Sequence, residues 1–166
     1  AGFTNINIDL MSGIPGQTLE SWKNTLKKVT MLKPEHISAY SLIIEEGTPF
    51  YESYRAGKLE LVSEEMDREM YHWTVDTLAE WGYGQYEISN FCRSGRESCH
   101  NSRYWALSEY LGFGPCAASD FAGKRFTLIA DLQGYINGIR TGGDIMDDIQ
   151  EIPLRERAGE YIMLRL

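Results

Sequence analysis

The sequence lacks long apolar runs, basic clusters and paired cysteines. Its apolar stretches fall well short of the roughly 20 residues of a membrane-spanning helix, and no basic-then-apolar leader opens it, so we expect a soluble, cytoplasmic protein. The cysteines are odd in number, without disulfide-rich spacing, which fits a reducing compartment. With 16 basic against 24 acidic residues, the net charge of −8 argues against nucleic acid and anionic membranes as direct partners.

The length and composition fit one domain or parts of two. The chain has 166 residues, 43% of them hydrophobic and 12% aromatic, enough for one ordinary core. It begins in strand-like sequence without an initiator methionine and ends inside a helical pattern. We therefore expect a piece of a longer protein, with a trimmed expression product as the alternative.

The first 45 residues predict a strand, a helix and a second strand. Residues 5–11 alternate polar and apolar, as strands do, and a turn with Gly13, Pro15 and Gly16 follows. Apolar residues three or four apart then predict a helix from Thr18 until Pro34, before a strand over 36–45. Such a βαβ unit has parallel strands and a right-handed crossover, and it needs further strands to bury its sheet.

The rest of the chain predicts shorter elements. These are a helix capped by Ser63 and ended by Gly82, a strand over 85–89, a helix from Asp131 through Arg140, an exposed loop around 142–148, and a last helix starting at Pro153. The glycines of residues 110–118 predict a tight passage of backbone against something flat.

Asp9 and the turn after it are the first candidate site. Asp9 is an acid among apolar residues near the C-terminal end of a parallel strand, where such sheets bind ligands. The turn SGIPGQT places backbone N–H groups at a helix N-terminus, as anion-binding loops do. The alternatives are a solvated or capping acid and an ordinary βα turn.

The stretch HNSRYW is the second candidate site. If it is helical, His100 and Tyr104 share a face, and aromatic side chains beside an imidazole are suited to bracket a porphyrin whose iron the imidazole ligates. The simpler reading is a core histidine among core aromatics, and without further context it is the favoured one. We assign His36 and His72 to strand and helix structure.

The cysteines and remaining acids offer weaker sites. Cys92 and Cys99 are six residues apart, which fits neither a zinc-type C-x-x-C pair nor covalent heme attachment. Cys116 has no such pair either. Glu45, Glu46 and Glu87 lie on or beside strands and are open to a functional or a solvated role.

At NINIDLMSGIPGQT, HISAYSLIIEEGTPFY, YEISNF and HNSRYW, the sequence closely resembles the radical-SAM heme chaperones, relatives of oxygen-independent coproporphyrinogen III oxidase. The resemblance covers nearly the whole chain, and H-N-x-x-Y-W is the mark of the heme-chaperone branch. It implies an α/β fold: residues 1–50 are the last strands and helix of a (β/α)6 partial TIM-type barrel, and residues 51–166 are a smaller α+β C-terminal domain, truncated at its end.

The same resemblance implies cofactors and partners. The intact protein is expected to bind heme, S-adenosylmethionine and a [4Fe-4S] cluster, and to deliver heme to respiratory enzymes. Asp9 matches the acid that hydrogen-bonds the S-adenosylmethionine ribose, and Ile43 the residue whose backbone meets the adenine. The expected heme contacts are His100, which is also the candidate iron ligand, with Asn101, Tyr104 and Trp105.

Two departures from the family pattern stand out. The family's cluster motif, C-x-x-x-C-x-x-C, and the glycine-rich segment after it are absent from these residues, so we expect this chain neither to hold the cluster nor to cleave S-adenosylmethionine. Cys116 and Ala118 stand in GPCAAS, where many members have G-P-G-A-H-S.

Two rival functions remain at this point. One is a true coproporphyrinogen III oxidase, so the sequence leaves open whether the intact protein is an enzyme. The other is an inactive fragment or interaction module without a cofactor, because half a barrel exposes apolar strand edges. Homodimer formation and peripheral membrane association through partners also stay open.

Overall fold

The computed structural model describes residues 2–165, which divide into two compact units. Unit 1 extends to Glu97 and unit 2 begins at Ser98. The division expected at residue 50 falls inside unit 1, because a long helix and two strands that follow residue 50 pack against the first sheet or pair with it.

Unit 1 is built on a four-stranded mixed sheet in the order β1-β2-β4-β3. The strands are β1 (Asn7–Ser12), β2 (His36–Ser41), β3 (Gly84–Glu87) and β4 (Asn90–Cys92). The parallel pairing of β1 with β2 is as the sequence predicts, and Asn7 lies opposite His36. The pattern did not predict β4, which runs antiparallel to both β2 and β3.

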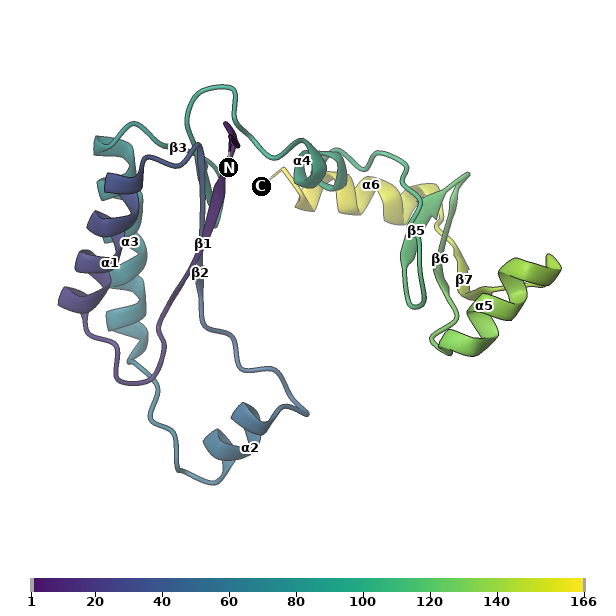
Figure 1. Cartoon of the computed structure of the whole chain (residues 1–166), viewed down its shortest axis with the longest axis horizontal. Coiled ribbons are helices and arrows are strands. Elements are labelled where there is room, and N and C mark those ends of the chain that lie inside the picture. Colours follow the sequence, from purple (N-terminus) through teal and green to yellow (C-terminus); the bar gives the residue numbers. More distant parts are fainter. Residues whose placement is uncertain (1, 166) are drawn as a thin grey trace. The chain divides into compact units, whose positions relative to one another are not determined.

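Two long helices, α1 (Leu19–Leu32) and α3 (Glu64–Glu80), lie on the same side of this sheet (Figure 1). Ser63 caps α3, as the sequence predicts, and Thr18 caps α1 in a capping box with Ser21. The short helix α2 (Pro49–Arg55) follows a loop after β2.

The core of unit 1 lies between these helices and one face of the sheet. Its buried members are Trp22, Leu26, Val29, Ile37, Met70, Leu78, Tyr83 and Phe91. Ile8, Leu10 and Ala39 pack against this core from the strands. Because side chains alternate along a strand, their neighbours in sequence point to the opposite face of the sheet, here called the open face.

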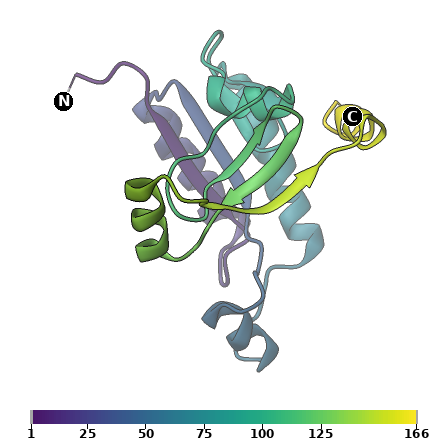
Figure 2. The ribbon, with the colours of Figure 1, turned by 90° about the vertical axis from the view of Figure 1, so that its right-hand side faces the viewer.

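Unit 2 contains a three-stranded antiparallel sheet in the order β5-β6-β7 (Figure 2). Its elements are α4 (Cys99–Trp105), β5 (Ala118–Phe121), β6 (Lys124–Leu128), α5 (Leu132–Thr141), β7 (Met146–Glu151) and α6 (Leu154–Met163). Asp131 caps α5 as predicted. The exposed loop expected around 142–148 is wrong from Met146 onward, because this residue pairs with Leu128 at the start of β7.

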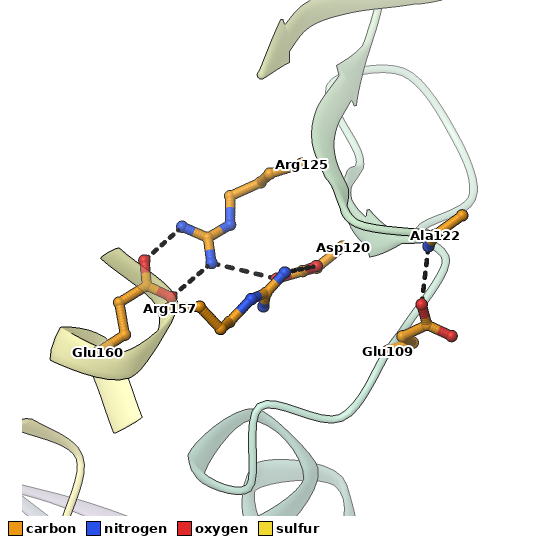
Figure 3. Close-up of polar contacts among 6 residues, drawn as sticks. All are labelled: Glu109, Asp120, Ala122, Arg125, Arg157 and Glu160. Carbon is orange, nitrogen blue, oxygen red and sulfur yellow. Dashed lines mark hydrogen bonds and ion pairs between the residues drawn. The ribbon is translucent and has the colours of Figure 1, made fainter. Parts of the chain in front are cut away.

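A cluster of four charged side chains joins α6 to the β5–β6 hairpin (Figure 3). Arg157 donates to both carboxylate oxygens of Asp120, at 2.6 and 2.8 Å, and Arg125 bridges Asp120 and Glu160. The Asp120 side chain is only 6% exposed. The hydrogen bonds from Arg157, more than those from Arg125, hold the pKa of Asp120 below its usual value.

The glycine-rich segment of residues 110–118 packs closely, as the sequence predicts, and at Gly112 it packs against the start of β5. A Cβ at Gly112 would collide with the carbonyl oxygen of Ala118, and the Gly112 N–H donates to Ser119 Oγ at 3.0 Å. The first residues of β5 thus account for this glycine. Within residues 2–165, no helix is long and apolar enough to cross a bilayer.

Candidate functional site

The open face of unit 1 carries a row of polar side chains, several of them buried. His36, Ser38 and Asn90 are 6%, 3% and 3% exposed, whereas Asn7 and Asp9 beside them on β1 are exposed. Strand register places Asn7 opposite His36, and Asp9 opposite Ser38. Buried polar groups need hydrogen-bond partners, so this face is a structured polar surface.

Hydrogen bonds connect this row from β3 to β1. His36 Nδ1 lies 2.7 Å from Asn7 Oδ1, and His36 Nε2 lies 2.7 Å from the Tyr86 hydroxyl. Asn7 Nδ2 donates to Asp9 Oδ1 at 2.7 Å. Burial lowers the pKa of His36, although the Asp9 carboxylate acts to raise it. The lowered pKa favours the neutral imidazole.

The sequence reasoning missed most of this network. It singled out Asp9 but assigned His36 to strand structure alone, and it did not consider Asn7 or Tyr86. The signal was present in part, because the alternation in the two strands puts Asn7 and Asp9 on one face of β1 and His36 on one face of β2. That Asn7 and His36 lie opposite each other depends on the register of β1 and β2, and the alternation in each strand does not give this register.

Asn90 adds an unused acceptor to the same face. Its amide nitrogen makes a short hydrogen bond to the Glu87 carboxylate. Its Oδ1 is buried and has no hydrogen-bond partner among the described residues. A buried acceptor of this kind fits a ligand that brings an N–H or O–H group to the open face.

Asp9 and Ile43 lie in unit 1 at different heights along the sheet. Asp9 is the third residue of β1, and Ile43 is 76% exposed and follows the end of β2 at Ser41. Ile43 lines a small cavity of about 230 Å³ together with Ser12 and Tyr71. The expectation that Asp9 lies near the C-terminal end of its strand is therefore wrong by half a strand, while its exposure leaves it accessible.

The HNSRYW stretch forms the short helix α4, capped by Ser98, whose hydroxyl accepts from the Asn101 N–H at 3.2 Å. The rings of His100 and Tyr104 meet edge to face, with centroids 5.0 Å apart, and Tyr104 meets Tyr110 in the same way at 4.7 Å. His100 and Tyr104 thus share a face, as a helix predicts. The reading of His100 as a core histidine is wrong, because it is exposed.

Trp105 and Tyr104 are 39% and 37% exposed, and both line a cavity of about 210 Å³ in unit 2. Asp120 and Arg125 form part of the same wall. The cavity is smaller than the roughly 300–1,000 Å³ of most ligand pockets, so a large planar ligand at α4 would lie on the surface.

The cysteines do not form a cluster site. Cys92 is buried and Cys99 and Cys116 are exposed, and burial raises the pKa of the Cys92 thiol. Within the part of the chain that the structure describes, no three His, Cys, Asp or Glu side chains are grouped to hold a metal. These residues therefore do not fit a [4Fe-4S] cluster, which needs several thiolates at one place.

The chain has relatives among known proteins, although no family model matches it. It is 39% identical over 165 residues to the heme chaperone HemW of Bacillus subtilis, covering 99% of this chain and 44% of the relative. It is 41% identical over 149 residues to HemW of Lactococcus lactis, covering 90% of this chain and 39% of the relative. The chain belongs to the family of the heme chaperone HemW.

The relatives extend beyond bacteria. The mitochondrial radical S-adenosyl methionine domain-containing protein 1 of Danio rerio is 36% identical over 116 residues, or 70% of this chain and 26% of that protein. The chain thus spans less than half the length of the curated relatives it matches.

A solved structure shares the fold. Coproporphyrinogen III oxidase HemN from Escherichia coli, described as a radical SAM enzyme, matches with a TM-score of 0.77 over 98% of this chain and 40% of that one. At 22% sequence identity, this likeness establishes a similar mixed α/β fold and nothing about activity.

Proposed function

We propose that this chain is part of a heme chaperone, which binds heme and passes it to respiratory heme proteins. Its two bacterial relatives, at 39% and 41% identity, are named heme chaperones. The observation that carries the proposal is the exposed imidazole of His100, backed by the rings of Tyr104 and Tyr110. An accessible imidazole supported by aromatic rings suits a planar iron porphyrin at the surface.

Four residues of α4 have a part in this proposal. His100 supplies a ring nitrogen to the heme iron, and Tyr104 limits the rotation of its ring through the edge-to-face contact. Trp105 offers apolar area to the porphyrin. Asn101 acts through its backbone, which is bonded to Ser98 and fixes the first turn of the helix.

We further propose that the intact protein binds S-adenosylmethionine and a [4Fe-4S] cluster, with the cluster ligands outside this chain. Asp9 would receive the ribose hydroxyls, and the backbone of Ile43 would meet the adenine. The polar open face supports this, because the interior of a ligand-binding barrel needs such a surface. Residues 1–50 would then supply strands and a helix of a (β/α)6 barrel, the rest of unit 1 would continue the same sheet, and the C-terminal domain would follow.

The alternative is a coproporphyrinogen III oxidase. The fold neighbour is such an enzyme, yet its identity of 22% is well below that of the heme chaperones. Activity of the intact protein on coproporphyrinogen would favour the alternative.

Homodimer formation and membrane association through partners stay predictions. Sedimentation would test the first, and flotation with vesicles would test the second.

Hemin titration of the chain, followed by the Soret band, tests the role of His100. His72 provides a matched control, because it too is exposed on a helix and meets a tyrosine ring, that of Tyr71, edge to face at 5.7 Å. We expect stoichiometric binding that His100→Ala weakens at least about tenfold, because losing even a residue that only supports a metal ligand costs about that much affinity. His72→Ala should leave the titration unchanged.

Equal losses in the two variants would mean that hemin binds exposed histidines without selection. Unchanged binding in His100→Ala would remove His100 from the heme site and return weight to the interaction-module alternative.

A further inference from the structure

The hydrogen bonds of the open face have a defined direction that begins at Asp9. The Asp9 carboxylate can only accept, so the side-chain nitrogen of Asn7, 2.7 Å away, must face it. This orients the amide, and Asn7 Oδ1 then faces His36 Nδ1 at 2.7 Å and Ser38 Oγ at 3.3 Å.

The same reasoning sets the tautomer of His36. An amide oxygen can only accept, so the proton lies on His36 Nδ1. Burial lowers the pKa of His36 and keeps the ring neutral, so Nε2 is unprotonated. The Tyr86 hydroxyl, 2.7 Å from Nε2, must therefore be the donor.

The result is a one-way series of donors, Tyr86 to His36 to Asn7 to Asp9. Its middle is rigid, because His36 is 6% exposed and lies directly opposite Asn7 in the parallel pairing of β2 with β1. The ring of Tyr86 also meets that of His36 edge to face, with centroids 5.6 Å apart. Asp9 is the exposed end that a ligand can reach.

We propose that His36 and Tyr86 are positioning residues, which orient Asn7 and through it hold the Asp9 carboxylate ready for a ligand with two neighbouring hydroxyl groups. The bond from Asn7 to Oδ1 fixes the plane of the carboxylate, and a cis-diol can donate to its remaining lone pairs. Naming the ribose of S-adenosylmethionine as this diol rests on the proposed function. The orientation of Asp9 by His36 and Tyr86 does not.

Nuclear magnetic resonance on the chain without ligand tests the series directly. The wild-type spectrum should show a neutral His36 protonated at Nδ1 and slowly exchanging Asn7 side-chain N–H signals. Tyr86→Phe keeps the ring and removes the donor to Nε2, so it should shift the His36 Nε2 signal and speed Asn7 amide exchange several-fold, while the bond to Asn7 keeps the proton on Nδ1. Tyr71→Phe is the control, since the Tyr71 hydroxyl contacts Gln85, which also lies on β3.

A wild-type His36 protonated at Nε2, or Asn7 signals that Tyr86→Phe leaves in place, would overturn the proposal. Equally faster Asn7 exchange in Tyr71→Phe would show a general loosening of the structure and would also count against the proposal.

Calorimetric titration with S-adenosylmethionine then separates this inference from the proposed function. Asp9→Asn should abolish binding, and Tyr86→Phe should weaken it about three- to tenfold, the range for one hydrogen bond. Unchanged binding in Asp9→Asn, or no binding by the wild type, would reject the contact between Asp9 and the ribose. The nuclear magnetic resonance experiment would then decide whether His36 and Tyr86 orient Asp9. Full binding in Tyr86→Phe beside loss in Asp9→Asn would reject the positioning role.

Discussion

Trp22 of α1 and Thr74 of α3 are joined by a buried hydrogen bond, in which the indole Nε1–H donates to the threonine hydroxyl at 2.9 Å. The same hydroxyl donates to the Met70 carbonyl at 2.7 Å. This bond ties together the two helices that cover the core face of the sheet in unit 1.

Thr74→Val should test this bond. The change keeps the shape and leaves the buried indole N–H without its acceptor, so the free energy of unfolding should fall by about 1–3 kcal/mol. Urea unfolding followed by tryptophan fluorescence measures it. Thr74→Ser retains the hydroxyl and should lose less, and equal losses in both variants would show that packing of the methyl group dominates.

Asp120→Asn should destabilise unit 2. Removing the carboxylate takes away the partner that Arg157 and Arg125 share, and because both arginine side chains are partly exposed, at 25% and 37%, the loss should be about 1–3 kcal/mol. Glu160→Gln is the control, because the Glu160 side chain is 26% exposed against 6% for Asp120. Equal losses in urea unfolding would contradict a special role for Asp120.

The stabilisation by Asp120 should also depend on pH in a defined direction. Its folded pKa is lowered, so its contribution is complete above the unfolded value of 3.8 and is lost as the pH falls through the lower folded pKa. The gap in stability between wild type and Asp120→Asn should therefore close in acid. A gap that stays constant from pH 6 to the acid transition would count against the ion pair.

His36 should give unit 1 a separate pH dependence. Its folded pKa is lowered from 6.5, so the unfolded state binds the proton first, and stability should fall as the pH drops through about 6.5 until the folded pKa is reached. Thermal unfolding of His36→Gln should show a flatter profile in this window. The exposed His72 provides the control variant, His72→Gln, which should keep the wild-type slope.

Cys116→Gly should stabilise unit 2. Cys116 has φ +60°, a left-handed conformation that favours glycine. Relief of this strain, less the added entropy of an unfolded glycine, should raise the free energy of unfolding by up to about 1 kcal/mol. Cys116→Ala keeps the strain and should show no such gain in urea unfolding.

Local patterns predicted the elements whose signals lie next to one another in the chain. Thr18 and Pro34 bound α1, Asp131 caps α5, and the spacing of His100 and Tyr104 puts their rings on one face of α4. These depend on helix periodicity and capping, which act over a few residues.

Contacts between distant residues decided the rest. The strand β4 is three residues long and gives too short a pattern to predict, and it exists because it pairs with β2 some 50 residues earlier. The ion pair of Asp120 with Arg157 spans 37 residues. No local rule encodes either one.

The sequence by itself therefore determined the helices α1, α3, α5 and α6, the parallel βα connection and the chemical identity of the candidate groups Asp9 and His100. Only the tertiary structure decided that His36 joins Asp9 through Asn7, that His100 is exposed, and that Cys92 is buried whereas Cys99 and Cys116 are exposed. The physical reason is range: capping and periodicity act within a few residues, whereas register and burial depend on which distant segments pack together.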